Sequence, residues 1–138
     1  MGKFDHIVIA VALDHEALVP AKLEMARGLL APGGRITLLT VLEDVPGFVA
    51  EFVEMRDANH LTTKVRDKVA SFAGDAPDVS VAVAKGKAGV QIVGHAEREG
   101  ADLIIVGSHA PSARDYFLGS TAARVTRRAH CSVFIIRE

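Results

Sequence analysis

The sequence is poor in the residues that mark several classes of protein. It contains one cysteine, Cys131, among 138 residues, so it can form neither an intrachain disulfide nor a cysteine-rich zinc site. Tryptophan is absent and aromatic residues make up 5% of the chain. No apolar run reaches the roughly 18–20 residues that a membrane-spanning helix needs. A disulfide scaffold, a zinc finger and a membrane-spanning helix are therefore not expected.

The net charge of the chain is close to zero. The 16 Lys and Arg residues nearly balance the 17 Asp and Glu residues, which leaves a formal net charge of -1. Such a chain has no long-range field that would gather nucleic acid or an acidic membrane, and we expect neither partner. The first residues, Met1 to His6, lack the apolar core and cleavage site of a secretory signal. The sequence therefore favours the cytoplasm.

Short apolar runs alternate with segments of helical spacing along the whole chain. Four runs are almost wholly apolar, as in parallel strands that are buried on both faces, and they cover residues 7–12, 36–41, 103–106 and 133–136. The run at 79–83 alternates polar and apolar residues, which is typical of an edge or half-covered strand. Helical stripes lie between the runs, at about 19–30, 52–72, 90–96 and 120–129.

Glycine and proline predict where three of these helices end. Pro32-Gly33-Gly34 is expected to end the first helix, Gly74 with Pro77 the second, and Gly100 the third. The regular alternation of strand and helix predicts an α/β fold. We expect a doubly wound, open parallel sheet with helices on both faces, formed as one domain over residues 1–138.

Ligands of such sheets bind beyond the carboxyl ends of the strands, where the strand order reverses. One exit is the most informative: the apolar run 103–106 ends in Gly107-Ser108-His109-Ala110, and Leu118-Gly119-Ser120-Thr121 then opens the last helix. Glycine lets a backbone approach a ligand closely, and the free N–H groups of a helix N-terminus attract anions. The pattern predicts a phosphate-binding site.

These motifs, in this order, resemble the universal stress protein family over essentially the whole chain. The matching segments are Val11–Asp14, Thr40-Val41, Gly86 with Ala88, Ala101–His109, Leu118–Ala122 and Cys131–Arg137. The resemblance implies a five-stranded sheet of order 3-2-1-4-5, like that of the adenine nucleotide alpha hydrolases, and a dimer. In one branch of the family it also implies ATP binding, with magnesium held through the phosphates.

The chain departs from the ATP-binding pattern Gly-x2-Gly-x9-Gly-Ser/Thr at two points. Gly107 and Gly119-Ser120 match this pattern. Ala110, however, stands in place of the second glycine, and eight residues rather than nine separate Ala110 from Gly119. Family members with a short loop also have a proline where Pro111 stands. Two functions therefore stay open: a short-loop ATP-binding stress or signalling module, and a nucleotide-free interaction module like the other branch. A related α/β enzyme is disfavoured, because no Ser-Gly-Gly loop follows the first strand.

The resemblance assigns roles residue by residue. It implies that Ala12, Leu13 and Asp14 border adenine and ribose and that the Val41 backbone meets the adenine edge, whereas Arg114 is a candidate for the γ-phosphate because it lies inside the predicted phosphate loop. It implies that the remaining contacts to ribose and phosphate come from Val106, Gly107, His109, Ala110, Gly119, Ser120 and Thr121. The alternatives are local: Asp14 caps a helix that starts near Glu16, Gly119-Ser120-Thr121 cap the last helix, and His109 stabilises its own loop. No catalytic set is visible, so we expect slow ATP hydrolysis or self-phosphorylation at most.

The last apolar run bears on assembly. An apolar strand at the edge of a sheet promotes association unless something covers it, and pairing with a second copy about a two-fold axis covers it. We therefore expect a homodimer through Val133, Phe134, Ile135 and Ile136. Two basic patterns carry no such prediction: Lys85-Gly86-Lys87 lacks the rest of a Walker loop, and Arg124, Arg127 and Arg128 fit the C-terminal end of a helix dipole.

Overall fold

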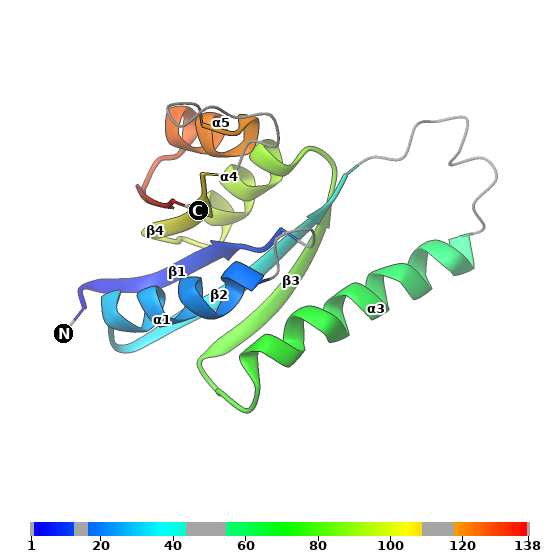
Figure 1. Ribbon diagram of the computed structural model, residues 1–138, viewed down its shortest axis with the longest axis horizontal. Helices are drawn as coiled ribbons and strands as arrows, with labels where there is room; N and C mark the ends of the chain where they lie inside the picture. The colour runs from blue at the N-terminus through cyan, green and yellow to red at the C-terminus, as the bar shows by residue number, and fades with distance from the viewer. Residues whose placement is uncertain (1, 13–16, 44–54, 109–117, 138) are drawn as a thin grey trace.

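Every strand in the described part of the chain joins one parallel sheet. The computed structural model describes residues 2–12, 17–43, 55–108 and 118–137, with residues 55–61 as backbone only. The elements in chain order are β1 (Phe4–Ala10), α1 (Val19–Leu29), β2 (Leu30–Leu42), α3 (Met55–Ala73), β3 (Val79–Lys85), α4 (Ala88–Arg98), β4 (Leu103–Gly107), α5 (Ser120–Arg128) and β5 (Ser132–Ile136). The strand order β3-β2-β1-β4-β5 confirms the predicted topology, with the alternating strand β3 and the last strand β5 at the two edges (Figure 1).

Helices cover both faces of the sheet, which explains the nearly continuous apolar runs of the central strands. Side chains of β1 alternate between the faces: Ile7 and Ile9 pack with α1 and α3, and Val8 and Ala10 pack with α4 and α5. Figure 1 shows α1 and α3 on one side of β1, and α4 and α5 on the other. Ile9 in the first core and Ile104 in the second are fully buried.

The second strand begins earlier than predicted. Helix α1 ends at Leu29, and β2 already includes Pro32-Gly33-Gly34, which the sequence had assigned to the end of the helix. Phe4 pairs with Leu30 and His6 with Arg35, so two steps along β1 match five along β2. The three extra residues form a bulge, in which Gly33 adopts a left-handed φ of 79°. The glycines thus serve an irregular strand rather than a helix cap.

The other two predicted helix ends are confirmed. Gly74 follows α3 with φ 58°, and Gly100 follows α4 with φ 68°, a backbone conformation that favours glycine after a helix. Helix α5 runs from Ser120 to Arg128, one residue short of the prediction. Within the described ranges, no helix is both long and apolar enough to cross a membrane.

A partly buried polar network ties the strands together at the amino end of β1. The carboxylate of Asp102 accepts hydrogen bonds from the backbone N–H groups of Asp5 and His6, at 2.8 and 2.9 Å. The His6 ring is 4% exposed, and its Nε2 lies 2.8 Å from Oγ1 of Thr37 on β2. Burial lowers the pKa of His6 below its usual value, so the neutral ring is favoured. This network is structural and lies at the end of β1 away from the predicted site.

Candidate functional site

The strand order reverses between β1 and β4, so the predicted site belongs where these two strands end. The registered pairs of β1 and β4 run from Ile7 with Leu103 to Ile9 with Ile105 and stop there. Strand β4 continues along β5 as far as Gly107 with Ile136. Beyond Ile9, β1 keeps its contact with β2 alone, since the Val11 N–H donates to the Leu39 carbonyl at 2.8 Å. We call this place, formed by residues 10–12 and 107–108, the switch point.

A hydrogen bond between Ser108 and β5 fixes the end of β4, and it leaves the N–H of Gly107 directed toward β1. The Ser108 N–H donates to the Ile136 carbonyl on β5 at 2.9 Å. Because backbone groups alternate in direction along a strand, the N–H of Gly107 is directed to the opposite side, toward β1. Gly107 is half-buried. The predicted role of Gly107 as a backbone donor is consistent with this direction.

The N-terminus of α5 lies against the same exit. The N–H of Gly119 donates to the Ser108 carbonyl at 3.2 Å, which joins the first turn of the helix to the end of β4. Gly119 is the N-cap residue and is buried, while Ser120 is exposed and Thr121 half-buried. The structure therefore brings Gly107, Gly119, Ser120 and Thr121 together, as the sequence predicted.

No side chain caps this helix in the part of the chain that the structure describes. The alternative that Ser120 caps α5 is wrong, because Ser120 is the first helical residue and Gly119 occupies the cap position. Gly119 has φ -61° and ψ 157°, which any residue can adopt, so backbone conformation does not require a glycine there. An uncapped N-terminus with its dipole directed at the switch point is suited to hold an anion.

The exit of β2 offers backbone groups on the side of β1. The Leu39 carbonyl bonds to Val11 of β1 and the Leu42 carbonyl to Gly86 beyond β3. By the same alternation, the N–H and carbonyl of Val41 are directed toward β1, past the last β1–β2 hydrogen bond. Its half-buried side chain packs against the core beneath α4 and α5. The predicted contact of the Val41 backbone with a base edge is thus geometrically open.

The exit of β1 is described only as far as Ala12, which is exposed. Helix α1 begins at Val19, with Leu18 at the N-cap position and no side-chain cap. The alternative that Asp14 caps a helix starting near Glu16 falls on residues 13–16, which lie outside the described residues. Leu13, Asp14, His109, Ala110 and Arg114, all predicted to line the site, lie outside the described residues.

Two side chains near the switch point are buried in the core: Val106, which was predicted to line the site, and Lys22, which was not. Val106 is 3% exposed and packs with the α4 and α5 core, so it can meet a ligand only through its backbone. Lys22 is 2% exposed, and its Nζ donates to the Ala10 carbonyl at 2.9 Å. No role for Lys22 was predicted from the sequence, because a lysine in an amphipathic helix normally indicates the solvent face.

A second overlooked residue is Glu43. Its Oε1 accepts a hydrogen bond from the Ala88 N–H at 3.2 Å, so the carboxylate sits at the N-terminus of α4. Negative charge is favoured there by the helix dipole. The contact spans 45 positions in the sequence, and no local pattern could have revealed it. Helix α4 is thus supplied with its own anion.

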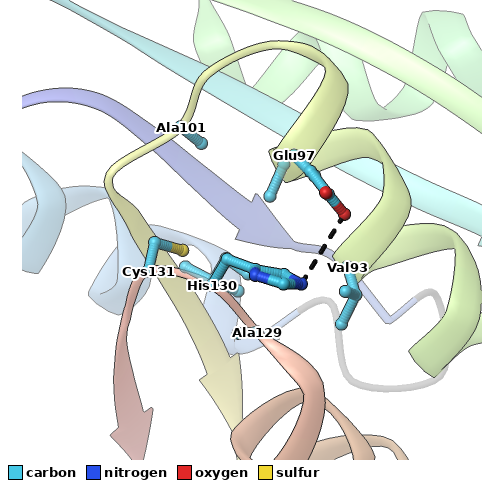
Figure 2. Close-up of a pocket in the computed structure, with 8 residues that line it drawn as sticks. Val93, Glu97, Ala101, Ala129, His130 and Cys131 are labelled. Atoms are coloured by element: carbon cyan, nitrogen blue, oxygen red, sulfur yellow. Dashed lines mark ion pairs between the residues drawn. The ribbon is translucent and has the colours of Figure 1, made fainter.

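A small cavity lies elsewhere, near the amino ends of β4 and β5 (Figure 2). It has a volume of about 20 Å³, roughly one water molecule, and its walls are mostly apolar. Cys131 lines it, and burial raises the pKa of this thiol, so the unreactive protonated form is favoured. His130 lies 3.9 Å from Glu97 at its rim, and both side chains are largely exposed. The cavity cannot hold a nucleotide.

The comparisons with known proteins agree on one family. The sequence profile of the universal stress protein family matches residues 3–137. Universal stress protein A homolog 2 from Coxiella burnetii is 31% identical over 144 residues, which cover 99% of this chain and 97% of that protein. Among solved structures, the hypothetical protein MJ0577 matches with a TM-score of 0.77 at 23% identity, over 97% of this chain and 96% of that one.

Two further solved structures are complexes with adenine nucleotides. One is a universal stress protein with cAMP, at TM-score 0.61 and 21% identity over 96% of both chains. The other is the universal stress protein from Archaeoglobus fulgidus with dAMP, at TM-score 0.61 and 18% identity over 94% of this chain and 95% of that one. At these identities the matches establish a shared fold.

Proposed function

Because the chain belongs to the universal stress protein family, we propose that it binds an adenine nucleotide at the switch point, with ATP as the ligand, and acts as a stress-response or signalling module. The observation that carries the proposal is the N-terminus of α5, which no described side chain caps and which the hydrogen bond from Gly119 to Ser108 holds against the exit of β4. Polyphosphate would supply an anion to this helix end, where no described side chain caps the helix.

Backbone groups from three strand exits support the proposal. The Gly107 N–H and the first amides of α5 suit phosphate oxygens, and the Val41 N–H and carbonyl suit the edge of a base. The cAMP and dAMP complexes of related folds fit an adenine ligand. No group of three or more His, Cys, Asp or Glu side chains in the described ranges is placed to hold a metal ion. Magnesium therefore enters the proposal only with the phosphates of ATP.

Binding, rather than rapid turnover, is the proposed role. Among the described residues, the groups near the switch point are backbone amides and the hydroxyl-bearing residues Ser120 and Thr121, which suit holding a phosphate rather than activating a nucleophile. Bound ATP would bias the conformation or the choice of partner, with slow hydrolysis or self-phosphorylation at most. We propose the cytoplasm as the place of action, and the nucleotide-free interaction module is the competing function.

We also propose that the protein is a homodimer through β5. This strand is an edge of the sheet, and the side chains of Val133, Phe134, Ile135 and Ile136 are all half-buried in the single chain. They belong alternately to the two cores, so apolar surface is open on both faces of the edge. A second copy paired about a two-fold axis would cover it.

ATP with magnesium is expected to raise the midpoint of thermal unfolding, because only the folded chain carries the site. At a free ATP concentration of about 100 times Kd, mass action adds about 2.7 kcal/mol to the free energy of unfolding. For a domain of this size that corresponds to a rise of about 10 °C. Differential scanning calorimetry measures the shift directly.

Magnesium with inorganic triphosphate is the matched control, since it carries the charge of ATP without adenosine, and it should shift the midpoint far less. If millimolar ATP leaves the midpoint unchanged, the nucleotide-free module is the better account. An equal shift with triphosphate alone would contradict an adenine site and indicate a nonspecific anion effect.

A further inference from the structure

A lysine occupies a core position of α1. Buried residues of this helix are Val19, Lys22 and Ala26, which follow one another at helical spacing on the face packed against the sheet. Lysine is almost never fully buried unless its ammonium is satisfied, because removing the charge from water is costly. The Nζ of Lys22 reaches the carbonyl of Ala10, the last residue of β1.

The direction of that carbonyl follows from the neighbouring hydrogen bond. The peptide between Ala10 and Val11 is trans, so its N–H and its carbonyl point in opposite directions. The Val11 N–H is bonded to Leu39 on β2, and the Ala10 carbonyl is therefore directed to the other side, toward β4. Lys22 thus donates to an acceptor that belongs to the β1–β4 side of the sheet.

The natural donor to this acceptor would be the amide of Gly107. The β1–β4 pairing stops at Ile9 with Ile105, although β4 itself continues to Gly107. The Gly107 N–H is directed toward β1, because its neighbour Ser108 donates to β5. One more rung of the ladder would join the Gly107 N–H to the Ala10 carbonyl. Lys22 takes that carbonyl instead.

We propose that Lys22 is a positioning residue for the ligand at the switch point. By donating to the Ala10 carbonyl, Lys22 replaces the last hydrogen bond that β1 and β4 could form. The Gly107 N–H then stays available for an anionic oxygen of the ligand. The role rests on the proposed function, and it is exerted through the backbone without contact between Lys22 and the ligand. On the opposite side of β1, toward β2, the Oγ1 of Thr40 donates to the Val11 carbonyl at 3.4 Å.

The test replaces Lys22 with methionine, which has a similar length and no donor. The ligand-free variant is expected to extend the ladder, so NMR should detect slower hydrogen exchange at the Gly107 amide. Affinity for ATP, measured by titration calorimetry, should fall about tenfold, the effect of one charge-assisted hydrogen bond lost from the site. Lys22→Arg keeps a donor and should restore most of the affinity. Lys22→Leu is the second apolar variant if the methionine variant does not fold.

Arg66→Met is the matched control. The Arg66 guanidinium also donates to a strand carbonyl, that of Val81 at 3.3 Å, but on β3 and away from the switch point. It should leave both the Gly107 exchange rate and the ATP affinity unchanged. Wild-type affinity in Lys22→Met overturns the inference, and so does weaker binding without any change at Gly107. If the wild-type chain binds no ATP but Gly107 exchange still slows in Lys22→Met, the proposed function fails while the ladder contact is upheld.

Discussion

Replacing Gly119 with aspartate is expected to weaken ATP binding by a factor of about 100 or more while the fold stays intact. Aspartate is a favoured N-cap residue, and the φ of -61° and ψ of 157° at Gly119 suit it. Its carboxylate would accept hydrogen bonds from the first amides of α5 and occupy the anion position itself. Losing charge-assisted hydrogen bonds of about 1.5–3 kcal/mol each accounts for the factor. Titration calorimetry measures the affinity, and thermal unfolding measures the stability.

Two further variants separate the causes. Gly119→Asn has the size and capping ability of aspartate without the charge, and Gly119→Ala adds only a methyl group. The aspartate variant should bind ATP more weakly than the asparagine variant, and the alanine variant should bind best of the three. Full binding by Gly119→Asp would contradict a phosphate position at this helix end. Unfolding of all three variants would mean that the buried glycine is needed only for packing.

Replacing Val133 with proline is expected to convert the proposed dimer into a monomer. The Ile136 carbonyl accepts from Ser108 on β4, so alternation directs the N–H of Phe134 toward β4 and that of Val133 away from it. Proline at position 133 removes an N–H donor from the open edge of β5 and leaves the hydrogen bonds between β5 and β4 intact. An edge strand tolerates proline at such a position. Sedimentation equilibrium should give the mass of one chain instead of two at micromolar concentration.

The neighbouring substitution is the control for this edge. Phe134→Pro removes an N–H directed toward β4, so it should lower the thermal midpoint, whereas Val133→Pro should change it little beyond the loss of the dimer. A wild-type protein that sediments as a monomer at micromolar concentration would refute pairing through β5. A stable dimer of Val133→Pro would place the interface elsewhere.

The fold class could be predicted because the central strands carry their burial in the sequence, whereas the strand order was predicted from the resemblance to the universal stress protein family. The runs around Ile9 and Ile104 are apolar without interruption, as strands buried on both faces must be, and the helical stripes between them have helical spacing. The start of β2 could not be predicted in the same way. Pro32-Gly33-Gly34 indicates a chain reversal, and only the pairing of Phe4 with Leu30 shows that the strand has already begun.

The residues that offer backbone groups to the candidate site could be predicted from the sequence. The side chains that support the site through hydrogen bonds could not. Gly107 and Gly119 stand out as small residues at a strand exit and at a helix start, and the structure brings both to the end of β4. Lys22 and Glu43 gave no signal, because their hydrogen bonds to Ala10 and Ala88 depend on how distant segments pack. A polar residue that acts within the fold has the same appearance in a sequence as one on the surface.

The central claim, that the switch point binds an adenine nucleotide, is tested most directly by NMR titration of the wild-type chain with ATP and magnesium. Backbone amide shifts should move first and furthest at Ala12, Val41, Gly107, Gly119, Ser120 and Thr121, while the amides of His130 and Cys131 beside the small cavity stay in place. Shifts centred on that cavity, or none at millimolar ATP, would contradict the account.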